Sequence, residues 1–168
     1  MVADGAYAKK AFLKPAKALG MTVVSRLRKD AALRTLPGPK LPGRRGPAPT
    51  YGDRRVELAK RAGQRRGWVT GVFDLYGAPV VKRYKTFLAT WRPVGGAIRM
   101  VLVDEPNGGR AFFCTDTSAS VAAFLGMVAD RFSLEITFRD CKEIVGARMN
   151  RPRSHCYGGR PSVERTMC

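Results

Sequence analysis

The sequence predicts a mixed α/β fold, because three different hydrophobic patterns follow one another along the chain. Residues 1–30 are patterned as strand, helix and strand, and residues 67–117 are rich in β-branched and aromatic side chains with a period of two. Residues 118–147 then contain one long helical pattern. With 168 residues, 45% of them hydrophobic, the chain is long enough to bury the core of one domain.

The first thirty residues predict a β-α-β unit. A short apolar run ends at residue 3, residues 9–19 fit a short helix that ends before Gly20, and residues 21–27 are a β-rich strand. The two strands are expected to be parallel, as strands joined by a helix usually are. Pro15 falls within the helical pattern, so a helix that begins there is an alternative to one that runs through it.

Asp4 directly follows the first predicted strand and is followed by Gly5. In open α/β sheets, ligand and metal groups lie at the carboxyl ends of the strands, where such an Asp would stand. A turn or helix N-cap is the plainer interpretation of the same residue.

Residues 31–66 predict a basic linker. Proline and glycine are too frequent between residues 34 and 50 for a helix or a central strand. Residues 51–67 are strongly basic and fit either a strand or a short helix. The positive charge of the linker would suit a phosphate backbone, and it would equally keep the segment solvated.

The β-rich part, residues 67–117, predicts strands over residues 68–74, 79–90, 97–103 and 110–115, with Asn107-Gly108 as a hairpin turn. The second of these strands alternates cationic and aromatic residues: Lys82, Arg83, Tyr84, Lys85 and Phe87. Two interpretations remain open, a basic strand face that binds nucleic acid phosphates and a half-buried strand whose charges lie in water.

The long helix, within residues 118–147, carries an unusual stripe. Residues three and four apart share a helix face, which aligns Val128, Arg131, Glu135, Phe138 and Lys142. Apolar neighbours disfavour an ionised carboxylate unless a cation or metal compensates it. The alternative is that Arg131, Glu135 and Arg139 form ordinary surface pairs, each worth a few tenths of a kcal/mol, about 0.3–0.5.

Composition favours a polyanionic partner. The net charge is +18, which attracts DNA or RNA through phosphate neutralisation and counterion release. No apolar run is long enough to span a bilayer and no basic amphipathic helix suits a membrane surface, so we expect a cytoplasmic protein without a membrane partner. The four cysteines lack the paired spacing of a zinc site, and the aperiodic residues 148–168 are expected to be disordered or out of frame.

Two segments together resemble a known family. Residues 2–8, Val-Ala-Asp-Gly-Ala-Tyr-Ala, and the spacing Arg131-x3-Glu135-x6-Lys142 are similar to the DDE transposases of bacterial insertion sequences. The subgroup is the one with a β-rich insertion between the second Asp and the Glu. The resemblance covers residues 2–147 and implies a partial RNase H-like core over residues 1–30 and 118–147.

The resemblance also implies a chemistry. In the family, two Asp and one Glu bind a pair of divalent metals, normally Mg²⁺, which activate the attacking water and clamp the scissile phosphate of the insertion-sequence ends. By motif position, Asp4 resembles the second Asp and Glu135 the Glu, so both are expected to ligate metal. Arg131 and Lys142 resemble the basic residues that hold phosphates near the metals. Further phosphate contacts are expected from Arg139 and, if the basic strand face binds nucleic acid, from Lys82, Arg83 and Lys85.

The sequence departs from the family in three places. Val128 stands where the motif usually has a tyrosine, the first Asp belongs to a strand upstream of residue 1, and residues 148–168 lack the glutamine-rich continuation. We therefore expect a DDE transposase truncated at both ends and inactive in DNA cleavage, with a homo-oligomer left open for the intact family. The alternative is a non-catalytic, basic DNA-binding protein.

Overall fold

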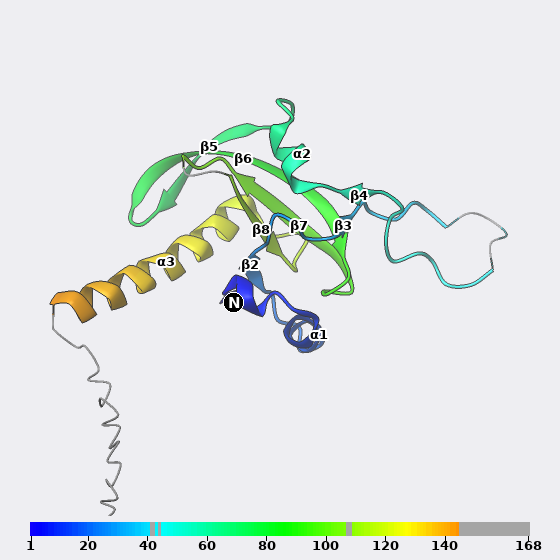
Figure 1. Cartoon of the computed structure of the whole chain (residues 1–168), viewed down its shortest axis with the longest axis horizontal. Helices are drawn as coiled ribbons and strands as arrows, with labels where there is room; N and C mark the ends of the chain where they lie inside the picture. The colour runs from blue at the N-terminus through cyan, green and yellow to red at the C-terminus, as the bar shows by residue number, and fades with distance from the viewer. Residues whose placement is uncertain (41–42, 44, 107–108, 145–168) are drawn as a thin grey trace, which may run out of the picture. The chain divides into compact units, whose positions relative to one another are not determined.

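The computed structural model describes residues 1–40, 43, 45–106 and 109–144, with the side chains of Glu135 and residues 138–144 excepted (Figure 1). The chain divides into two compact units, Met1–Glu135 and Ile136–Cys168. The sheet, its two hydrophobic clusters and the pocket discussed below all belong to the first unit. The predicted disordered tail and the predicted Asn107-Gly108 turn lie outside the described residues.

The described residues form a mixed sheet of eight strands. The strands are β1 (Val2–Ala3), β2 (Val24–Arg26), β3 (Leu33–Arg34), β4 (Arg55–Val56), β5 (Val69–Leu75), β6 (Ala78–Trp91), β7 (Gly96–Val103) and β8 (Arg110–Cys114). Their order is β1-β2-β8-β7-β6-β3-β4, and β5 pairs with β6 beside this path. Only the β1–β2 pair is parallel; the other pairs are antiparallel. The mixed α/β class predicted from the sequence is confirmed.

The predicted β-α-β unit is confirmed. Helix α1 (Lys10–Ala18) connects β1 to β2, and Val2 and Ala3 lie in parallel register with Val24 and Ser25. The second strand is shorter than the predicted residues 21–27. The alternative start of α1 at Pro15 is wrong: the helix runs through the proline, and its buried face, Leu13 and Ala16, spans both sides of it. Packing on that face compensates for the hydrogen bond that Pro15 cannot donate.

The four longer predicted strands are also confirmed, as β5 to β8. β6 pairs with β5 along its first half and with β7 along its second half, so it joins these two strands into one antiparallel sheet. The turn between β5 and β6 is Tyr76-Gly77, where both residues have positive φ, 59° and 75°. Such a turn matches the twist of a two-residue hairpin, and Gly77 adopts it without strain.

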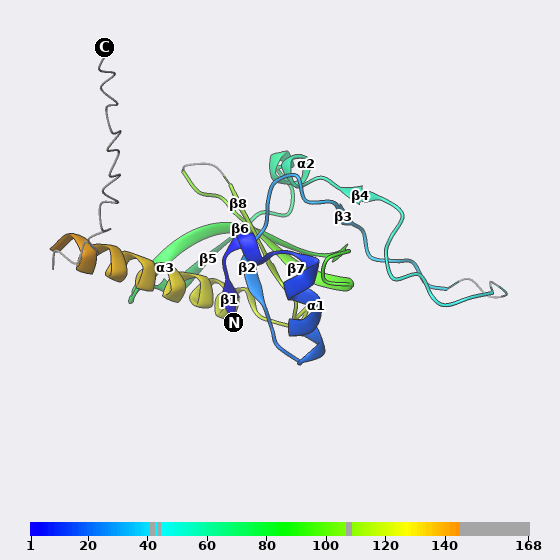
Figure 2. The ribbon, with the colours of Figure 1, turned by 60° about the horizontal axis from the view of Figure 1, so that its bottom comes forward.

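The sheet has a hydrophobic cluster on each face. On one face, Leu13 and Ala16 of α1 pack with Ile98, Met100 and Phe113 of the sheet. On the other face, helix α3 (Val121–Ile144) packs through Phe124 and Val128 against Val24, Val101 and Phe112. Figure 2 shows β1 and β2 between α1 and the first turns of α3. This two-sided packing brings the ends of β1 and β2 next to residues of α3.

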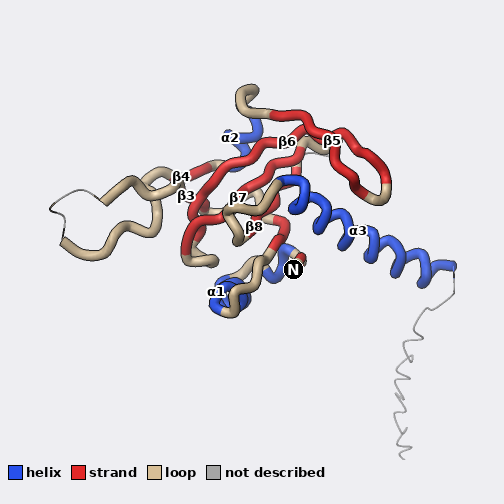
Figure 3. Tube along the Cα trace, turned by 180° about the vertical axis from the view of Figure 1, so that it is seen from behind, coloured by secondary structure: helices blue, strands red, loops and turns tan. Residues whose placement is uncertain are grey.

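The predicted linker contains more structure than expected. Between β3 and β4 the chain forms a long loop, whose two ends are joined by the hydrogen bonds Gly52 N–H to Thr35 O and Thr35 N–H to Arg54 O. The sequence allowed either a strand or a short helix for the basic residues 51–67. The structure contains both there, namely β4 and the short helix α2 (Leu58–Gly63). The loop extends away from the sheet in Figure 3.

Candidate active site

Asp4 lies where β1 ends and is the N-cap of the short 3-10 helix Gly5–Tyr7. Its Oδ1 accepts a hydrogen bond of 2.8 Å from the backbone N–H of Ala6. Gly5 is packed against β2, and a Cβ at Gly5 would be 3.2 Å from the carbonyl oxygen of Arg26. The N-cap interpretation of Asp4 is therefore confirmed, and its carboxylate stands at the carboxyl edge of the parallel pair, 59% exposed.

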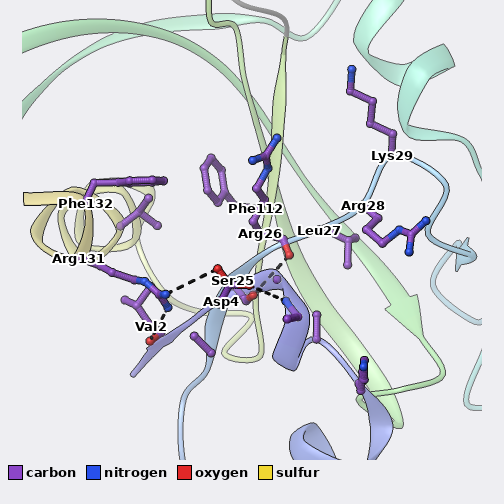
Figure 4. A pocket seen from close by; sticks show the side chains of 16 residues that line it. Val2, Asp4, Ser25, Arg26, Leu27, Arg28, Lys29, Phe112, Arg131 and Phe132 are labelled. Carbon is purple, nitrogen blue, oxygen red and sulfur yellow. Dashed lines mark hydrogen bonds and ion pairs between the residues drawn. The ribbon is translucent and has the colours of Figure 1, made fainter. Parts of the chain in front are cut away.

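Arg131 of α3 reaches this edge. Its guanidinium lies 3.7 Å from Oδ2 of Asp4 and donates a hydrogen bond of 3.4 Å to the carbonyl oxygen of Val2 (Figure 4). Val128 and Phe124, one and two turns earlier on α3, are buried against the sheet and hold this part of the helix in place. Asp4 and Arg131 belong to the two separate segments that carry the resemblance. The structure brings them together at one edge of the sheet.

A cavity of about 860 Å³ opens around Asp4. The ends of β1 and β2, the segment after β2 and one face of α3 form its walls, and Figure 4 shows Arg131 and Phe132 on the helix side with Asp4 and Ser25 opposite. Its charged lining consists of one acid, Asp4, and five cations: Lys9, Arg26, Arg28, Lys29 and Arg131. Such an excess of positive charge suits a polyanion such as a nucleic acid strand.

Four of these cations were not singled out from the sequence: Lys9, directly before α1, and three cations at or after the end of β2. Arg26, Arg28 and Lys29 follow or end β2, the strand parallel to β1, and all three are exposed. Arg28 forms an exposed pair with Asp30 at 3.2 Å. The carboxyl ends of neighbouring parallel strands meet at the same edge of a sheet. The sequence feature that could have identified these three cations is therefore their position at or directly after the second strand of the β-α-β unit.

Glu135, Arg139 and Lys142 are on α3, but their side chains lie outside what the structure describes. Glu135 is one helical turn beyond Arg131, and residues four apart share a helix face. The assignment of these three residues to metal or phosphate stays a prediction.

The cations of β6 all have partners within the protein. Lys82 donates to Glu105 at 2.9 Å, and Arg83 forms an ion pair of 3.2 Å with Asp104. The ammonium of Lys85, 4% exposed, donates hydrogen bonds of 2.8 Å to the carbonyl oxygens of Arg61 and Gln64. A phosphate contact from Lys85 would require these two hydrogen bonds to break. Its role in phosphate binding stays a prediction, and that role would cost the protein both bonds.

Burial lowers the pKa of Lys85, and the nearby guanidinium groups of Arg61 and Arg83 lower it further. The two carbonyl acceptors oppose this effect by binding the charged form. None of the three β6 cations lines the cavity beside Asp4. The structure therefore does not bring them together with the Asp4–Arg131 pair.

The described side chains do not by themselves fit a pair of divalent ions. Among them no group of three or more His, Cys, Asp or Glu side chains is placed to hold a metal ion. Asp4 offers one carboxylate, and Arg131 already balances its charge. A second carboxylate is expected from Glu135, whose side chain is not described.

Two further expectations concern the cysteines and membrane-spanning helices. Cys114 is buried in the core, where burial raises its pKa, and it is a packing residue; the remaining cysteines and His155 lie beyond the described side chains. Of the helices in the described part of the chain, none has both the length and the apolar character to cross a membrane.

Comparison with known proteins bears on this site. A family profile described as transposase DDE domain matches residues 1–155, which covers the sheet, α3 and the whole Asp4 cavity. Searches among curated proteins and among solved structures gave no match.

Proposed function

The chain belongs to the DDE transposase family, and on that premise we propose that the cavity beside Asp4 is part of the DNA-cleaving site of a bacterial insertion-sequence transposase. Members of the family are phosphodiester-cleaving enzymes of DNA transposition that bind DNA and use divalent metal, and the family implies an RNase H-like fold.

The observation that carries the proposal is the meeting of Asp4 and Arg131 at the rim of a cationic cavity. A carboxylate at the carboxyl edge of a parallel β-α-β unit is placed where α/β enzymes bind ligands. The cations around it offer charge-assisted contacts to phosphate oxygens. The combination fits a site that receives a DNA backbone next to a metal-binding carboxylate.

We assign the roles as follows. Asp4 and Glu135 would ligate divalent metal, normally Mg²⁺, which when bound supplies an activated water and charge stabilisation at the scissile phosphate. Arg131 would hold a phosphate beside Asp4, joined by Arg26 and Lys29 of the same cavity. By the resemblance, Arg139 and Lys142 would contact phosphates as well. A homo-oligomer that brings two DNA ends together is compatible with this arrangement.

We further propose that this chain by itself does not cleave DNA. Among the described side chains, Asp4 is the one carboxylate that lines the cavity, and a pair of divalent cations needs more negative charge than one carboxylate supplies. Arg131 beside Asp4 weakens the attraction for a divalent ion further.

A titration with Mn²⁺ tests the assignment. The purified chain is expected to bind the ion weakly, and Asp4→Asn or Glu135→Gln is expected to abolish that binding. Asp130→Asn, which removes an exposed carboxylate from the same helix, is the matched control and should leave binding unchanged. Equal binding by wild type and both site variants would refute the metal assignment, and metal-dependent cleavage of DNA by this chain would refute its proposed inactivity.

The second candidate, a non-catalytic DNA-binding protein, is favoured by the composition of the cavity, which has five cations and one acid. It requires neither Asp4 nor Glu135. If DNA binding is tight and salt-dependent while Mn²⁺ binding is absent, this candidate replaces the first.

A further inference from the structure

A second cationic surface lies on the sheet at α2, apart from the cavity beside Asp4. It consists of the exposed or half-exposed cations Lys60, Arg61, Arg65 and Arg66, which we call the α2 platform. Glu57 is the only acid in residues 57–68, so this stretch is strongly positive. The cavity beside Asp4 is lined by residues of other segments.

The platform is attached to β6 by an alternating set of contacts. Arg83, Lys85 and Phe87 project from the same face of β6, since side chains two apart in a strand share a face. The Lys85 ammonium binds the carbonyl oxygens of Arg61 and Gln64, and the Arg61 guanidinium lies 4.8 Å from the centre of the Phe87 ring. Figure 3 shows α2 beside β6.

Trp68 completes the attachment. The Arg83 guanidinium lies 5.1 Å and the Lys85 ammonium 5.0 Å from the centre of its ring, distances at which a cation is attracted to the ring face. Gly67, with φ of 85°, turns the chain so that Trp68 follows the end of α2 back onto the sheet. A side chain with a Cβ would be strained at that φ.

This attachment explains why a buried lysine stands on β6. Its ammonium satisfies carbonyl groups at the carboxyl end of α2, where a positive charge is also favoured by the helix dipole. Lys85 thereby orders the backbone that carries Lys60, Arg65 and Arg66, whose own charges remain in solvent. The cations are displayed from an ordered backbone, which reduces the entropy lost when they bind a partner.

We propose that the α2 platform binds the phosphate backbone of duplex DNA at a place separate from the cleavage site. This inference rests on the proposed function, since it names a second contact to the same DNA. Duplex DNA carries one negative charge per roughly 1.7 Å of its axis, so a fixed group of cations neutralises several phosphates and releases their counterions. A contact to phosphate oxygens is independent of base sequence, because the phosphates are the same whichever bases they join.

The test measures the salt dependence of binding to a short duplex of random sequence. The variant Lys60→Gln/Arg65→Gln/Arg66→Gln removes three exposed charges of the platform. The control Lys10→Gln/Lys14→Gln/Lys17→Gln removes three exposed charges from α1. Each phosphate contact contributes about 0.9 to the slope of log K against log salt, so loss of the platform should reduce the slope by about 2–3, and the control should change it by less than about 1.

The outcomes separate this inference from the proposed function. Suppose that the wild-type chain binds DNA. An unchanged salt slope in the platform variant, or an equal reduction of the slope in the α1 control, would then overturn the proposal that the platform binds DNA. A wild-type chain that bound no duplex DNA would overturn the proposed function together with the platform. Circular dichroism of both variants establishes that their fold is retained.

Discussion

Arg131 on α3 and Asp4 at the end of β1 form an ion pair of 3.7 Å, although they come from opposite ends of the sheet-forming unit. The pair is partly exposed, with 30% of the Arg131 side chain and 59% of the Asp4 side chain accessible. Arg131 also donates to Val2 O, so it connects the helix both to the carboxylate and to the backbone of β1. If Asp4 ligates metal, Arg131 and the metal compete for the same oxygen atoms.

The first prediction concerns this competition. Arg131→Gln should raise the affinity for Mn²⁺ by up to about fivefold, because an exposed pair is worth up to about 1 kcal/mol. The free energy of unfolding should fall by less than about 1 kcal/mol for the same reason. Titration calorimetry and urea denaturation measure the two effects.

Arg28→Gln is the control for Arg131→Gln. It breaks an exposed pair with Asp30 at the same cavity without touching Asp4, and it should leave the Mn²⁺ affinity nearly unchanged. A lower Mn²⁺ affinity in Arg131→Gln would show that the arginine orients Asp4 for the metal instead of competing with it.

The second prediction concerns the anchor of α3. Phe124 has no exposed surface, and its ring packs edge-on to Phe112 with 6.2 Å between centres. Phe124→Ala should lower the free energy of unfolding by about 3–5 kcal/mol, the usual cost of such a cavity. Leu134→Ala on the exposed side of the same helix should cost less than about 0.5 kcal/mol. Similar costs for both variants would argue against the packing of α3 on the sheet.

The third prediction concerns the base of the long loop between β3 and β4. A Cβ at Gly52 would overlap Thr35 and lie 2.6 Å from the carbonyl oxygen of Leu36, so the backbone would have to move. Gly52→Ala should destabilise the protein by about 1–3 kcal/mol. Gly38→Ala, at a position in the same loop where a Cβ meets no atom within 4 Å, should have little effect. Thermal unfolding of the two variants measures the contrast.

The fourth prediction concerns pH. Because burial lowers the pKa of Lys85, the folded protein releases this proton at a lower pH than the unfolded chain does. Between the two pKa values the unfolded chain holds more protons, so this group makes stability rise with pH in that alkaline window. The stability of wild type relative to Lys85→Met should therefore increase as pH rises through the window. A difference that stays constant with pH in parallel urea titrations would contradict the lowered pKa.

Much of the local structure follows from the sequence because short-range patterns determine it. The period of two over β5 to β8, the apolar spacing of α3, and the β-α-β order of β1, α1 and β2 are each set by residues close in the chain. Pro15 shows the limit of such reasoning, since tertiary packing of Leu13 and Ala16 kept the helix continuous where local propensity favoured a break. The candidate site followed less from local pattern than from the resemblance that paired Asp4 with Glu135.

By itself, the sequence determined the fold class, the longer strands and helices and the cationic character of the protein, and the resemblance proposed Asp4 and Arg131 for one site. Only the tertiary structure decided that β2 pairs with β8, that Arg26 and Lys29 share a cavity with Asp4, and that Lys85 points to the carbonyl groups of α2 instead of to solvent. The physical reason is that periodicity reports which face of an element is apolar, whereas strand order and the partner of a long cationic side chain depend on contacts between residues far apart in the chain.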